Sequence, residues 1–330
     1  MISNSIPDSV TATRRLAYCI CGYLLPACCL LFSANPAHAR DWQSAFYQDH
    51  ALVGKIWDTR KSRWISEQQL HAAVLDSKFI LLGETHDNPD HHRVQAQVLN
   101  WLVAAGQKPA VVMEMLAQEA WQDQPASWTD LKLLQQQAAA QDQRWPWDLY
   151  TPLLQSVVDH GLQLVAGNVK RETLHARIQA TGPGWRQELS ARYSIPEHGL
   201  GKLEQEIAES HCGYVDAAHL PFMVEAQLQR DRAMTSALAN SPVPAVLVAG
   251  RGHVRNDYAV PVQLRNACHC DSLLSVALHP VHADALKPED YLQGTRNAYD
   301  ILYFTPNHTR EDPCEKFRHQ LQNLRGQDTE

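Results

Sequence analysis

The sequence lacks any cluster of basic residues, and this absence argues against one large class of partner. The 330 residues include 29 lysines and arginines against 36 aspartates and glutamates, which gives a formal net charge of −7. Proteins that bind nucleic acid usually concentrate positive charge on one face or along one helix. We therefore expect no nucleic-acid partner. Internal repeats and low-complexity segments are also absent, so nothing indicates a repeat architecture.

Long apolar runs are missing too, apart from one near the amino terminus. Arg14 and Arg15 precede an apolar stretch over residues 16–32, and the sequence Ala37-His38-Ala39 follows it. A basic segment, an apolar segment and an A-x-A sequence are together typical of a secretory signal peptide. We predict a signal peptide over residues 1–39 and an exported protein, either in the periplasm or attached to the outer membrane.

Two alternatives concern this same segment. The apolar stretch could be a membrane-anchoring helix, but Gly22 and Pro26 interrupt it and its length is at the short limit for spanning a bilayer. The tetrapeptide Leu25-Pro26-Ala27-Cys28 resembles a lipobox, which would leave a lipid anchor on Cys28. Proline is atypical at the second lipobox position, so cleavage without lipidation is the first expectation.

Cysteine is scarce once the signal peptide is removed. Of the eight cysteines, Cys212, Cys268, Cys270 and Cys314 remain. In an oxidising compartment four cysteines indicate one or two disulfides, although their pairing cannot be deduced from sequence. Cys268-His269-Cys270 is not the C-x-x-C-H sequence that attaches c-type haem covalently, so covalent haem of that type is excluded.

What the sequence does contain is short apolar runs alternating with helical patterns. This alternation predicts an α/β fold, a largely parallel sheet flanked by helices. Asn88 is predicted to cap a helix that begins at Pro89. The predicted strands cover residues 78–83, 110–114, 162–167, 244–249, 272–278 and 299–304.

The segment between the third and fourth predicted strands is too long for a single crossover. Its pattern is mostly helical, so we predict a helical insertion or subdomain at about 170–240 that covers one end of the sheet. The α/β domain then spans residues 40–300, and residues 301–330 form a carboxyl-terminal strand and a polar tail. The predicted helices of the insertion cover residues 171–180, 185–192, 201–211 and 221–239.

Polar side chains follow four of the predicted strands. Glu84 and His86 come after the first, Glu114 after the second, Asn168 after the third and His253 after the fourth. In open α/β sheets ligands bind at the carboxyl ends of the strands. We therefore expect these side chains to meet around one cavity, although each residue alone could have a purely structural role.

If the cluster is catalytic, Glu84 or Glu114 would act as a general base on water. His86 and His253 would then bind a divalent metal or stabilise an oxyanion. Burial and mutual repulsion of the two carboxylates could raise the pKa of one of them enough for that role.

The same residue types also suit a transition metal such as zinc or manganese. The candidate ligands are Glu84, His86, His91, Glu114 and His253. His91 and His92 point about 100° apart at the start of a helix. We expect His91 to face the site and His92 to lie in solvent.

The helical insertion contains a second group of chemically active residues. His211-Cys212-Gly213-Tyr214 ends a predicted helix and His219 follows. Imidazole, thiolate and phenolate can all ligate haem iron. The alternatives are a disulfide for Cys212 and ordinary packing for Tyr214. Gln227 and Asp231 share a helical face that looks either into the site or into solvent.

The aromatic run over residues 145–150 either packs in the core or lines a pocket for a flat porphyrin.

These residues together resemble the ChaN family of haem-binding, iron-regulated proteins, within the superfamily of erythromycin esterases and TraB/Tiki proteins. The match extends from about residue 50 to 280, and GExHDNPxHH followed by GxGHVR is a specific combination. The matching residues are Gly83 to His92, Val112-Met113-Glu114, Trp147 to Tyr150, Pro152, His211-Cys212, Ala226-Gln227, Arg230-Asp231, Met234 and Ala249 to Arg255.

The resemblance implies export, non-covalent haem binding, a homodimer with a tyrosine ligand, and contact with outer-membrane haem-uptake machinery. We assign Tyr214 as the iron ligand because it lies beside the matching His211-Cys212, with His211, His219 and Arg251 as further haem contacts. One departure is Ala259, where the family tends to have glycine. A left-handed turn at that position would be strained by a Cβ atom.

Three functional hypotheses follow. The first is an exported haem-binding protein of haem or iron uptake. The alternative is a metal-dependent, protease- or esterase-like hydrolase that uses Glu84, His86, Glu114 and His253, so enzymatic activity is left open. A third hypothesis is a scaffold in which this cluster is only structural.

Overall fold

The computed structural model describes residues 41–125, 127–179, 182–292, 294–312, 314, 315 and 318. The predicted signal peptide and most of the polar tail lie outside these residues. Within them, no helix is both long enough and apolar enough to cross a membrane. The strands are β1 (Ile56–Asp58), β2 (Arg63–Ile65), β3 (Phe79–Glu84), β4 (Ala110–Ala117), β5 (Leu164–Asn168), β6 (Ala245–Gly250), β7 (Leu273–Pro280) and β8 (Ile301–Thr305).

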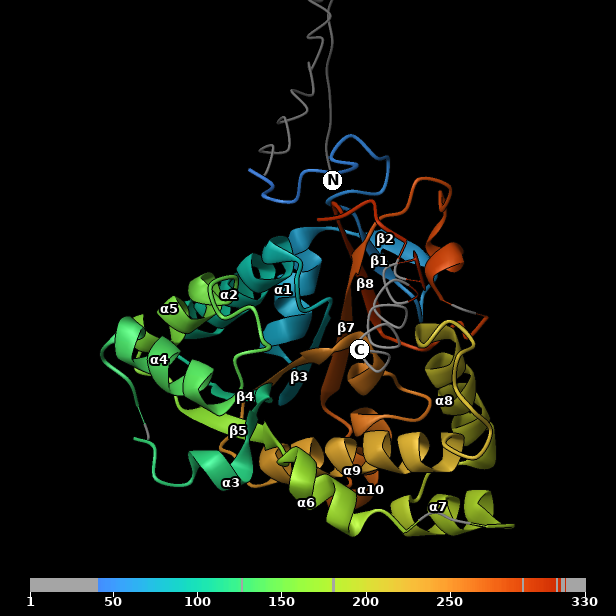
Figure 1. Cartoon of the computed structure of the whole chain (residues 1–330). Helices are drawn as coiled ribbons and strands as arrows, with labels where there is room; N and C mark the ends of the chain where they lie inside the picture. The colour runs from blue at the N-terminus through green and yellow to red at the C-terminus, as the bar shows by residue number, and fades with distance from the viewer. Residues whose placement is uncertain are drawn as a thin grey trace, which may run out of the picture. The chain divides into compact units, whose positions relative to one another are not determined.

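The eight strands form one sheet in the order β2-β1-β8-β7-β3-β6-β4-β5 (Figure 1). The strands from β8 to β5 are parallel, while β1 is antiparallel to both β2 and β8. A largely parallel sheet flanked by helices was predicted and is confirmed. All six predicted strands are present, with ends that differ by at most a few residues.

The antiparallel pair β1 and β2 was not predicted. Each strand has only three residues, and Arg63 and Trp64 of β2 are exposed. Such short strands show neither an apolar run nor a clear alternation, so their sequence carries little signal. They extend the sheet on the side away from the cluster of polar strand ends.

Helices cover both faces of the sheet. They are α1 (Glu67–Leu75), α2 (Pro89–Ala104), α3 (Gln118–Trp121), α4 (Leu131–Gln141), α5 (Thr151–Asp159), α6 (Arg171–Arg177), α7 (Trp185–Tyr193), α8 (Glu197–Ser210), α9 (Leu220–Ala239) and α10 (Val260–Cys268), with short 3-10 turns η1 (Arg251–Val254) and η2 (Pro288–Tyr291).

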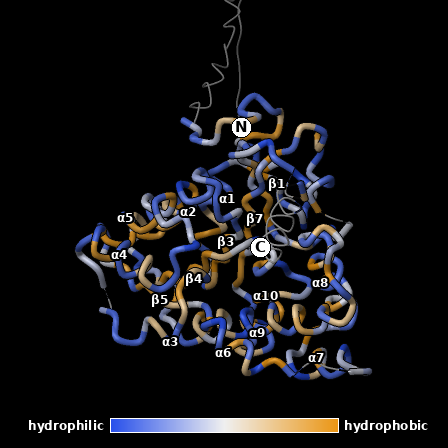
Figure 2. The backbone as a smooth tube through the Cα atoms, viewed as in Figure 1, coloured by the Kyte–Doolittle hydropathy of each residue, from blue (hydrophilic) through white to orange (hydrophobic). Residues whose placement is uncertain are grey.

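Alternate residues of the central strand β3 supply the two core layers. Ile80 and Leu82 pack with α1, α2 and α5 on one face. Phe79 and Leu81 pack with α9 and α10 on the other. This period of two is the expected geometry of a strand buried on both faces. Figure 2 shows the result as apolar strands β3, β4 and β7 inside a shell of more polar helices.

The start of α2 follows the predicted capping. The Asn88 side chain accepts a hydrogen bond from the backbone N–H of Asp90, and Pro89 is the first helical residue. The same asparagine donates to the Pro306 carbonyl oxygen, which ties the helix start to the chain after β8. This cap fixes the direction of the residues that follow Glu84.

Helices α6 to α9 occupy the long segment between β5 and β6, in agreement with the four helices predicted there. α7, α8 and α9 share an apolar cluster of their own, which includes Leu189, Leu203 and Leu228. Tyr258, from the loop after β6, also belongs to this cluster and anchors the helices to the end of the sheet. The cluster accounts for how this region holds together beyond the sheet.

Candidate functional site

The first half of the site surrounds Glu84 at the end of β3. One carboxylate oxygen lies 2.9 Å from Nδ1 of His86 and accepts a hydrogen bond from the Tyr150 hydroxyl. The other lies 3.3 Å from Nδ1 of His92 and accepts from the Gln95 amide. Glu84 is buried. Each of its carboxylate oxygens has two polar partners, as a buried carboxylate requires.

The second half surrounds His253, in the 3-10 turn after β6. Its Nε2 lies 3.2 Å from the Glu114 carboxylate and its Nδ1 lies 2.5 Å from Asp231 of α9. Glu114 also accepts the backbone N–H of Gly250 at 2.7 Å. Gln227, one turn before Asp231, lies 3.0 Å from Nδ1 of the same imidazole. The face shared by Gln227 and Asp231 therefore looks into the site.

The two halves meet because β6 lies between β3 and β4 in the sheet. Nε2 of His86 lies 4.0 Å from the Glu114 carboxylate, so Glu84, His86, Glu114 and His253 form one continuous cluster. Gly250 makes this approach possible, since a Cβ atom there would lie 3.1 Å from His86 Nε2.

The charges of the cluster oppose the carboxylate-base hypothesis. Burial alone would raise the pKa of Glu114, but His253, His86 and the Gly250 N–H outweigh it and lower that pKa to about 2. Burial of Glu84 is likewise outweighed by His92 and His86, so the pKa of its carboxyl is well below the usual range. The prediction of a raised glutamate pKa is wrong, because imidazoles rather than carboxylates are the nearest neighbours.

The pKa values of His253, His86 and Asp231 are raised. Burial lowers the pKa of His253, but Glu114 and Asp231 outweigh it and raise the value to about 10. Burial raises the pKa of the Asp231 carboxyl to about 6 despite the neighbouring imidazole. Burial also lowers the pKa of His86, yet Glu84 and Glu114 together raise it above its ordinary value. The site is thus a set of hydrogen-bonded imidazole–carboxylate pairs, in which each partner favours the charged form of the other.

The two histidines at the start of α2 exchange their expected roles. His92 is fully buried and contacts Glu84, so the prediction that it lies in solvent is wrong. His91 is equally buried, but its Nδ1 accepts the Thr85 N–H and its Nε2 bonds the Thr305 hydroxyl. These bonds turn His91 toward β8, away from the cluster in which it was placed.

The described residues contain no group of three or more His, Cys, Asp and Glu side chains arranged to hold a metal ion. Glu84, His86, Glu114 and His253 instead bond one another and their neighbours. The geometry of the described residues therefore does not support the predicted transition-metal site.

Two cavities open on either side of the cluster. The larger, of about 810 Å³, is lined by residues from the ends of β4 and β5 and from α6, α8 and α9, with Glu114 and His253 on its wall. The smaller, of about 530 Å³, is bounded by Glu84, His86 and Arg251. Arg144 and Trp145 line both cavities. The Trp145 ring packs edge-on against His86 at 4.8 Å, so the aromatic run contributes to the site as well as to the core.

Residues 70–264 match the profile of a family described as haem-binding uptake, Tiki superfamily, ChaN. The matched segment is more than half of the sequence. The chain belongs to the ChaN family. It is similar to a solved structure of cofacial haem binding to ChaN of Campylobacter jejuni, with 20% identity, a TM-score of 0.59, and coverage of 75% of this chain and 95% of that one.

Two further solved structures are more distant from this ChaN-family chain. An erythromycin esterase, EreC in its open conformation, has 12% identity, a TM-score of 0.43, and coverage of 75% and 95% of the two chains. The type III effector HopBA1 has 14% identity, a TM-score of 0.38, and coverage of 72% and 92%. No protein of curated function matches the sequence.

The expected haem contacts separate in space. His211 lines the larger cavity. Tyr214 and His219 do not: 52% of Tyr214 and 75% of the His219 side chain are exposed. Arg251 lies in the smaller cavity and donates to the Thr85 hydroxyl. Of the four, only His211 is therefore placed to meet a ligand in the larger cavity.

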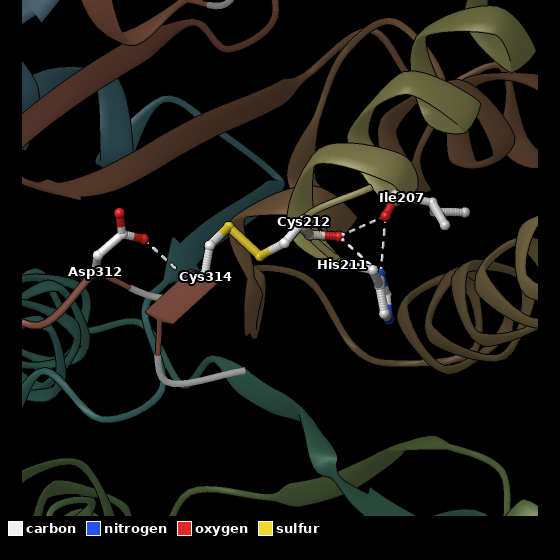
Figure 3. Close-up of a disulfide and its surroundings, with 6 residues drawn as sticks. Ile207, His211, Cys212, Asp312 and Cys314 are labelled. Carbon is white, nitrogen blue, oxygen red and sulfur yellow. Dashed lines mark hydrogen bonds between the residues drawn. A yellow bond between two sulfur atoms is a disulfide. The ribbon is translucent and has the colours of Figure 1, made fainter. Parts of the chain in front are cut away.

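Cys212 forms a disulfide with Cys314, with a Cα–Cα distance of 5.5 Å, and therefore offers no thiolate (Figure 3). A second disulfide joins Cys268 and Cys270.

Several members of the site were not predicted. Gln95 bonds Glu84 and was not considered, Tyr150 was considered only as part of the aromatic run, and His92 was expected in solvent; no strand end marks any of them. They come from α2 and from the start of α5, where a polar residue on an otherwise apolar helical face was the available signal. Ala259 adopts an extended backbone with φ of −99°, so the strain expected from a left-handed turn at this departure from the family does not arise.

Proposed function

We propose that this protein binds haem non-covalently in the larger cavity. The observation that carries the proposal is the combination of apolar walls and cationic groups in one space of about 810 Å³. Cavities of roughly 300–1,000 Å³ are the usual size for cofactor-sized ligands. Membership of the ChaN family supports the same ligand.

The lining of the cavity fits the chemistry of haem. Trp145, Leu174, Ile207, Phe222 and Met223 supply apolar and aromatic surface for the flat porphyrin ring. The cavity is also lined by four cationic side chains, which suit the two propionates by charge-assisted hydrogen bonds. These are Arg144, Lys170, Arg171 and Arg230.

We infer that His211 is the iron ligand, in place of Tyr214. Its Nδ1 lies 2.8 Å from the Ile207 carbonyl oxygen, one helical turn back (Figure 3). This bond places the proton on Nδ1 and the lone pair on Nε2, the arrangement that orients metal-bound histidines in general. His175, which packs edge-on against Phe222 on the same cavity wall, is the second imidazole available.

Haemin titration of the purified mature protein tests both statements. We expect a Soret band that saturates at a fixed haem-to-protein ratio, and a shifted and weakened band in His211→Ala. His219→Ala is the matched control, since that imidazole is exposed and lies outside the cavity, and Tyr214→Phe should also bind as the parent does. A parent protein with no Soret band would contradict haem binding. Loss of the band in Tyr214→Phe alone would instead return the ligand assignment to Tyr214.

The cellular role that we propose is haem or iron uptake by an exported protein, in the periplasm or attached to the outer membrane. Two disulfides support export, because such bonds persist in oxidising compartments. Cell fractionation with mass spectrometry of the mature amino terminus tests it, and an uncleaved protein in the cytoplasm would contradict it. A homodimer and contact with outer-membrane uptake machinery belong to the same proposal; light scattering with and without haemin tests the dimer.

Hydrolysis is the second candidate, and one observation favours it. His86 is hydrogen bonded to Glu84, its side chain is 33% exposed, and it lines the smaller cavity, so it could exchange a proton with a ligand there. In this version the His86 side chain, and not a glutamate, is the group that exchanges the proton. Ester hydrolysis lost in both His86→Ala and Glu84→Gln would support it. Elemental analysis of the same samples tests the metal-dependent form.

A further inference from the structure

The two disulfides of the chain close loops of very different length. Cys212 and Cys314 are 102 residues apart, whereas Cys268 and Cys270 are separated by two and enclose only His269. A disulfide stabilises a fold mainly by restricting the unfolded chain, and this effect grows with loop length. The Cys268–Cys270 bond therefore contributes little to the stability of the fold. By thermodynamic linkage, folding contributes little to the resistance of this bond to reduction.

The backbone inside the short loop is held in an uncommon conformation. His269 has φ of 52°, the left-handed region that costs a non-glycine residue about 1–2 kcal/mol. It caps the end of α10, with its N–H bonded to the Arg265 carbonyl. Cys268 Sγ lies 3.1 Å from the Leu264 carbonyl oxygen. A sulfur in a disulfide has no hydrogen to donate, so reduction to a thiol would convert this contact into an S–H···O hydrogen bond.

The loop is also accessible. Cys268 and Cys270 are half-buried, while Ala267, His269 and Asp271 beside them are exposed, so a small thiolate can approach the sulfurs. Access of the attacking thiolate is one of the main determinants of exchange rate.

This position is remote from the haem cavity and the titratable cluster. β7 begins at Leu273, which pairs with Phe79, the first residue of β3. The loop therefore lies beyond the amino ends of these strands, whereas Glu84 ends β3 on the opposite edge of the sheet. An activity here would be independent of the site described above.

We propose that Cys268-His269-Cys270 is a thiol–disulfide exchange site that oxidises a small dithiol, or two molecules of a monothiol such as glutathione. A thiolate of the reagent attacks one sulfur, the Cys268–Cys270 bond breaks, and the other cysteine leaves as a thiolate. A second reagent thiol attacks the mixed disulfide and releases the first cysteine. Two electrons pass to the protein, two protons move from the reagent to the cysteines, and the reagent leaves as a disulfide.

Reduction of the native protein with graded dithiothreitol tests the proposal, with Cys212–Cys314 as a reference in the same molecule. After an acid quench, differential alkylation and mass spectrometry report each cysteine separately. We expect the Cys268–Cys270 bond to be half reduced at a dithiothreitol concentration at least about tenfold lower than the concentration that half reduces Cys212–Cys314. Reduction of both bonds together, or of Cys212–Cys314 first, would overturn the proposal.

Three further measurements separate exchange from a structural role and from haem binding. The double variant Cys268→Ser/Cys270→Ser should keep the parent melting temperature, and a marked loss would mean that the bond serves the fold. The single variant Cys270→Ser should form a mixed disulfide with oxidised glutathione on Cys268, and no adduct would contradict accessibility. Haemin titration of the selectively reduced protein should match that of the oxidised protein. If neither form binds haemin, the function proposed for the cavity fails while the exchange results stand.

Discussion

At the scale of single residues, the site depends on one imidazole held between two carboxylates. His253 is buried between Glu114 and Asp231, and the pKa of its imidazole is raised to about 10 because these carboxylates outweigh burial. A histidine with a raised pKa stabilises the fold fully below its ordinary pKa of 6.5. That contribution is lost as pH rises from about 6.5 through about 10.

This loss of stability with rising pH leads to a prediction for His253→Gln. Breaking a buried ion pair costs about 3–5 kcal/mol, so the variant should be less stable than the parent by an amount of this order at pH 6. The difference should shrink toward pH 10, and urea unfolding at both pH values measures it. His279→Gln is the matched control: burial and Arg251 lower the pKa of this imidazole, so it is neutral in the folded protein at both pH values and the stability difference should not shrink as pH rises. A difference for His253→Gln that is equal at pH 6 and pH 10 would contradict the buried ion pair.

Two glycines give a second prediction at this scale. A Cβ atom on Gly83 would lie 2.3 Å from a methyl group of Val254 and 3.0 Å from the Arg251 Cα. On Gly250 it would meet the His86 ring at 3.1 Å, and that ring is partly exposed and can move. Gly83→Ala should therefore cost about 1–3 kcal/mol of unfolding free energy, and Gly250→Ala clearly less. Denaturant unfolding of both variants gives the comparison, and the reverse order would mean that the β6 end is the more tightly packed one.

At the scale of secondary structure elements, a covalent bond restrains the cavity wall. Ile207 and His211, at the end of α8, line the larger cavity, and the next residue, Cys212, is bonded to Cys314 after β8 (Figure 3). Removing a disulfide that closes a loop of about 100 residues costs up to about 4.7 kcal/mol in the chain-entropy description.

We therefore expect Cys212→Ser/Cys314→Ser to lower the melting temperature and to weaken haemin binding several-fold, because the end of α8 is no longer held in place. Cys268→Ser/Cys270→Ser is the control and should change neither property. Calorimetry and haemin titration on the two double variants supply the readouts. Unchanged haemin affinity in the first variant would show that α8 is positioned by its apolar packing alone.

Elements were more predictable than contacts. A continuous apolar run is a strong local signal for a strand that is buried on both faces, and this signal identifies β3, β4, β6 and β7. The polar residues that come after each run are then predicted to lie at the ends of these strands. β1 and β2 are too short and too exposed to show a pattern. Tyr150 and His92 were not assigned to the site because their contact with Glu84 depends on how α2 and α5 pack against the sheet, and sequence spacing does not encode that. Asp231 was identified as a candidate, but which way its helical face points was decided only by the fold.

At the scale of the whole molecule, haem would contact parts of the chain that lie far apart in the sequence. The walls of the larger cavity come from the strand ends of the sheet, from α6, α8 and α9, and from the loop containing Arg144 and Trp145. A ligand that binds only the folded protein stabilises it by RT ln(1 + [L]/Kd), which is about 2.7 kcal/mol at a free ligand concentration of 100 Kd.

Haemin should therefore raise the melting temperature in a concentration-dependent way and keep one cooperative transition. In His211→Ala the same haemin concentration should give a smaller increase, and in His219→Ala the full increase. Differential scanning calorimetry measures all three, and an increase that persists unchanged in His211→Ala would place the haemin outside the cavity that we assign to it.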